Sequence, residues 1–257
     1  MYWAKSLITR VNQGGGLISE NMSVLFEARF AYELYKKGVQ FEYEYPAGVG
    51  DSKVEFRIIQ PKEWLIELVS IRRSEGVKRA TKKRGSFYML NLTTDSSDPH
   101  QSEEAEMITA EQKIGEKVFS NGKPTKFPPI ATAYHMIITD MRGYLAQGGY
   151  IDDYRQMAYG PSGLPKNKEM LIHFWKIRPE KKEPIKGLFE KGNPLESSKY
   201  ICQRIHFLGF VRETDYAEGE ITNKTCCLGN PHLFKDEQEI KKAYQSYPLA
   251  KEVKCYL

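Results

Sequence analysis

The sequence SKVEFRIIQPKEWLIELVSI, residues 52–71, contains two strand-like runs joined by a short turn. Each run is rich in β-branched and aromatic residues, and a proline lies in the turn, so the sequence predicts a β-hairpin. Each run carries one central acid, Glu55 in the first and Glu67 in the second. Leu65 and Val69 share the strand face of Glu67, so we expect that face to be at least partly covered. A carboxylate on a covered face needs a partner or a metal ion.

A helix with a third acid is predicted just before the hairpin. Apolar residues recur at spacings of three and four over residues 22–37, and Gly38 provides a C-cap. Glu27 lies on this helix. Residues 40–45 then alternate polar and aromatic side chains, which is typical of a half-exposed strand. The expected order is therefore a helix acid followed by two strand acids.

Downstream of the hairpin, the pattern predicts more helices and strands. A second helix is expected over residues 103–119 and a long buried strand over residues 130–140. The continuous apolar character of that strand suits a central or parallel position in a covered sheet. The remaining predictions are a short helix over 152–159, strands over 170–177 and 205–211, and a terminal helix over 235–244. This mixture indicates an α/β or α+β fold.

The composition is that of an ordinary globular protein. The chain has 257 residues, of which 40% are hydrophobic and 28% charged, so it is long enough to bury a real core. Its net charge of +5 fits a nucleic-acid ligand without requiring one. The first ten residues lack the apolar core of a signal peptide, and no apolar run approaches the roughly 18 residues that span a bilayer. We therefore expect a cytoplasmic protein without membrane contact. Four cysteines in this length do not make a disulfide framework.

Basic residues are concentrated between positions 72 and 84. Such a run can contact the phosphates of a nucleic acid, although a solvated charged surface is the alternative. The residues expected to bind nucleic acid are Arg72, Arg73, Lys78, Arg79, Lys82 and Lys83.

Residues 26–70 resemble the PD-(D/E)XK nuclease superfamily, the fold of restriction enzymes and archaeal junction resolvases. In that pattern an N-terminal helix carries a glutamate, matched here by Glu27, and a second strand carries the first metal acid, usually aspartate and here Glu55. The third strand carries an acid, any residue and a lysine, which correspond to Glu67-Leu68-Val69. The resemblance implies a restriction-endonuclease-like three-layer α/β core with a central mixed sheet over residues 1–145. Residues 146–257 would form an α+β C-terminal extension, either packed on the same core or separate from it.

The resemblance also implies a chemistry. Glu55 and Glu67 would bind Mg²⁺ or Mn²⁺, and Glu27 would hold a metal-bound water or a second ion. A metal-activated water would then hydrolyse phosphodiester bonds, with DNA favoured over RNA as the substrate. Whether the protein forms a homodimer is left open.

The chain departs from the family pattern at Val69, which occupies the position of the motif lysine. Lys53 is one candidate substitute because it precedes Glu55 by two residues and shares its strand face. Lys113 and Lys117 on the following helix are the alternatives, and Arg72 is a weaker one. If no amine reaches the carboxylates, the protein is expected to bind nucleic acid or a protein partner without cutting.

A third hypothesis is an α+β interaction protein whose acids are surface features. It is favoured if the side chains of Glu55 and Glu67 point to opposite faces of the sheet. Hydrolysis is favoured if a lysine amine lies within a few ångström of both carboxylates.

Overall fold

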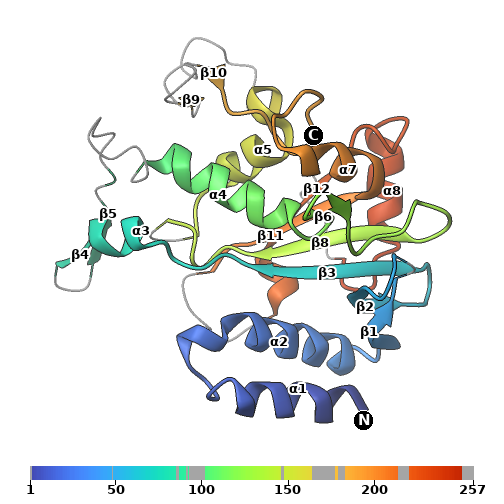
Figure 1. The fold of residues 1–257 in the computed structure, drawn as a ribbon. Coiled ribbons are helices and arrows are strands. Elements are labelled where there is room, and N and C mark those ends of the chain that lie inside the picture. The colour runs from blue at the N-terminus through green and yellow to red at the C-terminus, as the bar shows by residue number, and fades with distance from the viewer. Residues whose placement is uncertain are drawn as a thin grey trace.

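The centre of the computed structural model is a six-stranded mixed sheet with the strand order β1-β2-β3-β8-β11-β12 (Figure 1). The neighbours β3, β8 and β11 run parallel, and the other neighbouring pairs are antiparallel. The strands are β1 (Phe41–Pro46), β2 (Lys53–Ile58), β3 (Trp64–Ser70), β8 (Tyr134–Asp140), β11 (Phe207–Val211) and β12 (Thr225–Gly229). The structure describes residues 2–47, 49–84, 87–90, 92, 102–145, 148–163, 177–178, 183–213 and 220–250.

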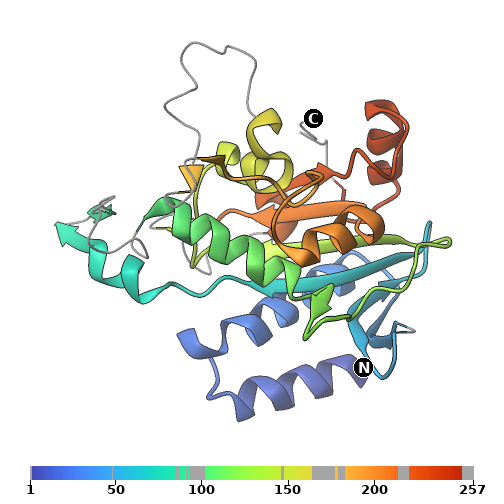
Figure 2. The same cartoon turned by 45° about the horizontal axis from the view of Figure 1, so that its top comes forward.

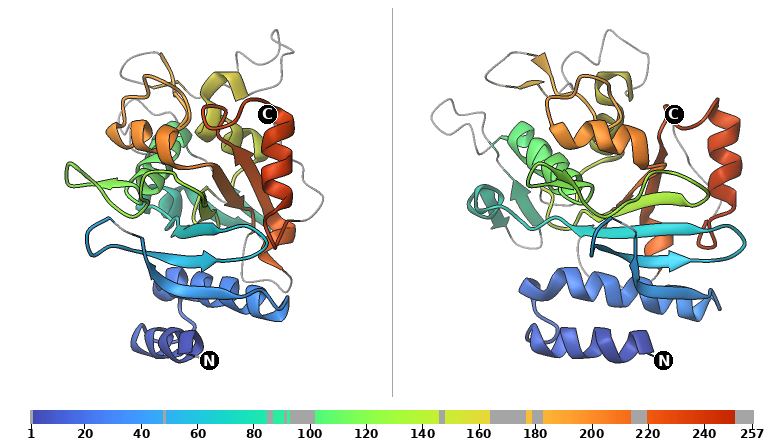
Figure 3. Two further views of the ribbon diagram at one scale, coloured as in Figure 1. Left: turned by 90° about the vertical axis from the view of Figure 1, so that its right-hand side faces the viewer. Right: turned by 45° about the vertical axis from the view of Figure 1, so that its right-hand side comes forward.

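Helices cover both faces of this sheet and give the molecule three layers. One layer contains α1 (Tyr2–Gln13), α2 (Met22–Lys36) and α8 (Glu237–Gln245). The opposite layer contains α4 (Glu103–Gly115), α5 (Ile151–Tyr159) and α7 (Glu196–Arg204). Figures 1 and 3 show α1 and α2 below the sheet and α4, α5 and α7 above it. The structure therefore confirms a mixed α/β fold around a central mixed sheet.

Smaller elements lie around this core. Beyond the end of β3, the chain forms α3 (Glu75–Ala80), β4 (Thr81–Arg84) and β5 (Phe87–Leu90), which extend away from the sheet (Figures 1 and 2). Two further strand pairs are β6 (Phe119–Ser120) with β7 (Lys123–Pro124), and β9 (Ile177–Arg178) with β10 (Glu183–Pro184). Short 3₁₀ turns are η1 (Ser19–Asn21), η3 (Gly160–Gly163) and η4 (Ile221–Lys224).

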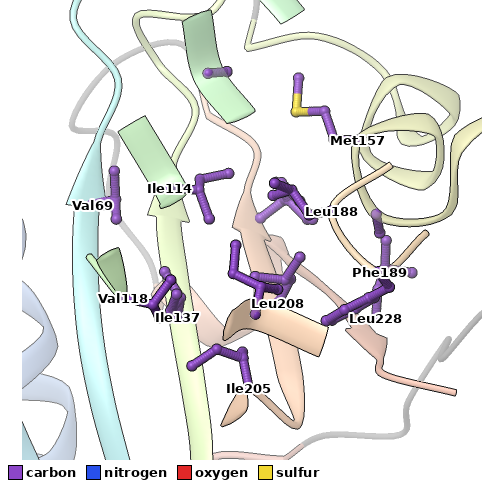
Figure 4. Packing of buried hydrophobic residues seen from close by; sticks show 14 of the residues in the cluster. Val69, Ile114, Val118, Ile137, Met157, Leu188, Phe189, Ile205, Leu208 and Leu228 are labelled. Atoms are coloured by element: carbon purple, nitrogen blue, oxygen red, sulfur yellow. The ribbon is translucent and has the colours of Figure 1, made fainter. Parts of the chain in front are cut away.

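The side chains of β3 alternate between the two layers. Ile66 and Leu68 belong to the apolar cluster on the α2 side, whereas Leu65 and Val69 belong to the cluster on the α4 side. Figure 4 shows part of the α4-side cluster, including Val69. Strict alternation along a strand places Glu67 on the same side as Leu65 and Val69, beneath α4.

Most predicted elements are present with ends shifted by a few residues, and β8 has the predicted central, parallel position. The helix predicted over residues 103–119 ends earlier, at Gly115. An added Cβ at Gly115 would lie 2.1 Å from Ser197 Oγ, so glycine allows α4 to approach α7 closely. The predicted strand over 170–177 lies outside the described residues except for Ile177. Helices α1 and α7 and strand β12 were not predicted.

The central sheet contains strands from both predicted segments, residues 1–145 and residues 146–257. β11 pairs with β8 along its whole length, and β12 then pairs with β11 at the edge of the sheet. Strands from residues 146–257 therefore complete the sheet begun by residues 1–145. In the described part of the chain, no helix is both long enough and apolar enough to cross a bilayer.

Candidate active site

The regular ladder between β2 and β3 stops beside the two strand acids. Its last backbone pair is Phe56 with Ile66. Beyond that pair, carboxylates accept hydrogen bonds from the backbone: the Glu55 N–H donates to Glu67 Oε2 at 3.2 Å, and the Leu68 N–H donates to Glu55 Oε2. The two side chains are thus tied to each other's strands at the point where the strands separate.

The neighbouring strand β1 is distorted at the same level. Glu44 has a positive φ of 55°, which is uncommon for a residue with a side chain. On one side of it, Tyr43 packs against the apolar cluster of the α2 layer, and on the other side Tyr45 packs against the cluster of the α4 layer. Side-chain alternation therefore shifts by one residue at Glu44, between the two positions that pair with β2 on either side of Glu55.

Two lysines meet the acids. Lys117 Nζ lies 2.7 Å from Glu67 Oε1 and 3.4 Å from Glu55 Oε1, and Lys126 Nζ contacts the same Glu67 oxygen. The Glu67 side chain has no exposed surface, whereas 25% of the Lys117 side chain and 29% of the Lys126 side chain are exposed. The lysines therefore reach the acids from the solvent side. We call Glu55, Glu67, Lys117 and Lys126 the four-charge cluster.

Both lysines belong to one β-hairpin, residues 117–126, which we call the lysine hairpin. Its strands are β6 and β7, and its turn residues Asn121 and Gly122 have φ values of 53° and 73°. Two consecutive positive φ angles are typical of a type I′ turn, for which Asn-Gly is the favoured sequence. The turn folds the chain back so that its first and last lysines reach the same carboxylate.

The lysine hairpin is held together by its own hydrogen bonds and is anchored to the rest of the protein at two points. Thr125 donates from its N–H to the Val118 carbonyl at 2.8 Å and from its hydroxyl to the Lys117 carbonyl at 2.9 Å. Val118 is buried in the apolar cluster beside β8, where Figure 4 shows it near Ile137. The Ser52 hydroxyl, just before β2, donates to the Thr125 carbonyl at 3.4 Å. These contacts tie the hairpin to the strand that carries Glu55.

Burial and mutual repulsion shape the electrostatics of the cluster. Burial, and then the charge of Glu67, raise the pKa of Glu55 well above its ordinary value, while the nearby Lys117 opposes that rise. Burial alone would lower the pKa of Lys117, but the charges of Glu55 and Glu67 outweigh it and raise that pKa. Lys117 is therefore a firmly charged ammonium group at neutral pH.

The third predicted acid, Glu27, has different partners. Arg10 Nη1 lies 2.6 Å from Glu27 Oε2, and the Tyr43 hydroxyl donates to the same oxygen at 2.6 Å. Burial and the charge of Glu27 raise the pKa of the Tyr43 hydroxyl. Arg10 comes from α1, a helix that the sequence did not predict. Glu27 therefore joins a separate buried group, and its charge acts on Glu55 only as a smaller contribution to the raised pKa of Glu55.

The two lysines predicted to replace the motif lysine lie elsewhere. Lys53 is exposed on β2, and Lys113 pairs with Glu116 at 2.8 Å, with 54% of each side chain exposed. Had α4 continued, Lys117 would have shared the helix face of Lys113. Because the helix ends at Gly115, Lys117 turns inward instead. Lys117 was an alternative in the sequence analysis, and Lys126 was missed although the Asn-Gly turn between the two lysines was visible.

The basic residues predicted to bind nucleic acid lie in the segment beyond β3. We call residues 72–84 the basic arm. Arg72 is exposed and donates to the Glu20 carbonyl at 3.4 Å, while Lys78 pairs with Glu75 at 2.6 Å. The other exposed members are Arg73, Arg79 and Lys82, and the side chain of Lys83 lies outside the described part of the structure. The basic arm therefore presents several cations to solvent.

The two carboxylates of the four-charge cluster are oxygen ligands of the type that hard divalent cations take, but both are paired with lysine ammonium groups in the structure. Among the described residues, no group of three or more His, Cys, Asp or Glu side chains is arranged to hold a metal ion. Glu55 and Glu67 nevertheless bring two carboxylates together. Mg²⁺ is commonly bound by one or two carboxylates, with waters and substrate phosphates completing its shell. Two carboxylates would leave most of the shell of such an ion to water or to other oxygen ligands.

Comparisons with protein-family models, with curated proteins and with solved structures found no significant match to this chain. The resemblance of residues 26–70 to PD-(D/E)XK nucleases therefore stays a prediction. The chemistry of the site rests on the contacts of its own residues.

Proposed function

We propose that this protein is a divalent-metal-dependent nuclease with a restriction-endonuclease-like core that hydrolyses phosphodiester bonds, preferentially in DNA. The observation that supports this most strongly is the meeting of the Glu55 and Glu67 carboxylates at the Lys117 ammonium group, at distances of 3.4 and 2.7 Å. Two acids and an amine are the set that the family resemblance requires. Here Lys117, in the turn after α4, would supply the amine that the motif lysine provides in the family, because Val69 occupies the motif position.

The order of elements supports the same proposal. The resemblance calls for a helix, three strands and a further helix. α2, β1, β2 and β3 follow one another in that order, and α4 comes after the inserted elements α3, β4 and β5. Glu55 and Glu67 approach each other at one break in the sheet, which argues against the hypothesis of two unrelated surface acids. Complete burial of Glu67 argues against it as well.

In the proposed reaction, Glu55 and Glu67 hold Mg²⁺ or Mn²⁺. When bound, such an ion neutralises charge on the phosphate and lowers the pKa of a water molecule. Lys117 keeps its ammonium group beside the carboxylates and can donate to a phosphate oxygen or orient the attacking water. The lysine hairpin fixes that position through the burial of Val118 in the apolar cluster and through the hydrogen bond from Ser52 to Thr125.

The exposed cations of the basic arm favour a polyanionic substrate. These cations can contact backbone phosphates without reading the base sequence. We place the basic arm in the substrate-binding surface, adjoining the end of β3, the strand that carries Glu67.

Binding of nucleic acid without cleavage is the second candidate function. Two observations favour it: Glu27 is already paired with Arg10, and two ammonium groups already neutralise the strand acids. A protein of this kind would use the basic arm and leave phosphodiester bonds intact.

Cleavage assays separate the two candidates. The full chain is incubated with single- and double-stranded DNA and RNA in the presence of Mg²⁺, Mn²⁺ or EDTA. The nuclease proposal predicts DNA cleavage with either metal, none with EDTA, and none by Glu67→Gln. Equal cutting by Glu67→Gln would assign the activity to a contaminant, and binding without cutting by the wild-type chain would favour the second candidate.

A further inference from the structure

One oxygen of Glu67 carries two ammonium groups. Lys117 Nζ lies 2.7 Å from Oε1, and Lys126 Nζ contacts the same atom. Both lysines come from the lysine hairpin, and both remain partly exposed, so their heads can withdraw without unfolding the strands. Lys126 is not needed to replace the motif lysine, because Lys117 already approaches both carboxylates.

The charges of this cluster are balanced. By formal charge, two carboxylates and two ammonium groups sum to zero around a fully buried Glu67. Adding a divalent cation alone would place two positive charges beside two ammonium groups in a region of low effective dielectric constant, where repulsion is strong. The cation would also have to displace an ammonium group from Glu67 Oε1. The acids therefore offer little to a metal ion as long as both lysines stay in place.

A backbone phosphate changes this balance. It brings a negative charge, oxygen ligands for the metal, and a new partner for the ammonium groups. If the lysine heads move from Glu67 to the phosphate, Glu67 Oε1 becomes available to the metal while the lysines remain paired. Repulsion between the metal and the lysines is then offset by the phosphate between them.

We propose that Lys126, acting with Lys117, makes divalent-cation binding at Glu55 and Glu67 depend on a nucleic-acid phosphate, so that metal and phosphate bind together. This inference rests on the proposed nuclease function. Lys126 is a positioning residue: it occupies Glu67 Oε1 and so prevents metal binding there until a phosphate binds the lysine. Because such coupling is reciprocal, the metal must also strengthen binding of the nucleic acid.

The test is a titration of Mn²⁺ into the full chain, with free Mn²⁺ measured by electron paramagnetic resonance. It is done alone and with a short phosphorothioate DNA duplex that resists cleavage. Wild type is expected to bind Mn²⁺ at least about tenfold more tightly with the duplex. Glu67→Gln with the same duplex measures the Mn²⁺ that the DNA binds by itself.

Three variants sharpen the test. Lys126→Met removes one positive charge and one partner of Glu67 Oε1 from the cluster, so it is expected to bind Mn²⁺ alone at least about tenfold more tightly and to lose most of the coupling. Lys126→Arg keeps the charge and should behave as wild type. Lys123→Met, an exposed lysine of the same hairpin, should also behave as wild type.

The outcomes separate the inference from the function that it rests on. Tight Mn²⁺ binding by wild type without DNA, lost in Glu67→Gln, would overturn the inference and leave the nuclease proposal standing. Unchanged Mn²⁺ affinity in Lys126→Met would also overturn the inference alone. If Glu67→Gln never alters Mn²⁺ binding, with or without duplex, both proposals fail.

Discussion

The Glu67 carboxylate has no exposed surface, so the folded protein tolerates its charge only because other groups compensate it. Removing one partner of a buried ion pair typically destabilises a protein by about 3 to 5 kcal/mol, because the other charge is left uncompensated. Glu67 shares its charge between Lys117, Lys126 and the Glu55 N–H, so loss of one lysine leaves two contacts. Single lysine variants should therefore fold, which makes their activity interpretable.

Replacing Lys117 tests its proposed role at the phosphate. Lys117→Met is expected to reduce DNA cleavage by about 100-fold, the usual effect of removing one group that stabilises transition-state charge. Initial rates at saturating Mg²⁺ measure the effect. Lys123→Met is the matched control, because Lys123 is exposed on the same hairpin and should keep wild-type rates. A fully active Lys117→Met would exclude Lys117 as the replacement for the motif lysine.

A pair of buried histidines should make stability depend on pH. Burial lowers the pKa of His135 to about 4 and that of His206 to about 3, and the His135 N–H donates to His206 Nδ1 at 3.0 Å. Both values lie below the ordinary value of 6.5, so the unfolded chain binds more protons. Their contribution is complete above about pH 6.5 and is lost as the pH falls toward the folded-state values, by up to about 1.4 kcal/mol per pH unit for each histidine.

Denaturant unfolding of wild type and His206→Asn between pH 7.5 and pH 4.5 measures this dependence. Asn can accept the same backbone hydrogen bond and does not titrate, so its free energy of unfolding should fall less steeply with decreasing pH. His232→Gln serves as the control at a histidine outside the pair. Identical slopes for wild type and His206→Asn would show that His206 does not titrate as its burial implies.

The sequence predicted which acids belong to the candidate site better than it predicted which lysines do. Glu55 and Glu67 were predictable because each lies in a strand-like run whose neighbours are apolar. Lys113 and Lys117 were both expected on a helix that continues to residue 119. The helix ends at Gly115, where the close approach to Ser197 joins residues far apart in the sequence and leaves no local pattern.

Among the elements, the lysine hairpin is the part on which the site depends most. Gly122 has a φ of 73°, and an added Cβ would meet no atom within 4 Å, so a substitution there strains only the backbone. Gly122→Ala is expected to lower the free energy of unfolding by about 1 to 2 kcal/mol. It should also reduce cleavage by roughly tenfold to a hundredfold, because small displacements of catalytic groups have large effects on rate.

Gly38→Ala provides the matched control for this prediction. Gly38 follows α2 with a φ of 68° and equally open surroundings, so its substitution should cost similar stability. Because Gly38 lies away from the lysine hairpin in the chain, cleavage by Gly38→Ala should remain near wild type. Thermal unfolding and initial rates on the same preparations compare the two. Equal loss of activity in both variants would reduce the effect to general destabilisation.

The elements themselves were predictable where one local pattern dominated. α2, β3 and β8 have clear apolar periodicity or continuity, and each was located within a few residues. β6 and β7 are two residues each, too short for any periodicity, and only their Asn-Gly turn marks them. α1 was not predicted, yet its Arg10 determines where Glu27 points. A helix that owes its position to packing on α2 leaves a weak local signature.

For the whole molecule, the prediction concerns salt dependence of nucleic-acid binding. Replacing Arg72, Arg79 and Lys82 of the basic arm with Gln should reduce the slope of log K against log salt by about 2 to 3 units. Fluorescence anisotropy with labelled DNA at several salt concentrations measures the slope. The control replaces the exposed Lys235, Lys241 and Lys242 around α8, which changes the net charge equally. An equal effect of both sets would mean that binding follows net charge and not the basic arm.

The overall architecture was predictable only in part. The sequence indicated a mixed sheet between helices, but how residues 146–257 relate to it depended on pairing between distant strands. β11 joins β8 across roughly seventy positions, as in the register of Phe207 with Met136. Such pairings are decided by the complete fold and leave no local pattern.

The burial of Glu67 has a consequence for biosynthesis. A nascent chain that has reached only residue 100 contains both acids but neither of the ammonium groups that neutralise them, and it also lacks β8, which covers the free edge of β3. Folding that segment alone would desolvate an uncompensated charge. We therefore expect the β2–β3 hairpin to fold stably only after residues up to about 140 have emerged from the ribosome. Chains truncated before residue 140 are expected to be degraded or to aggregate.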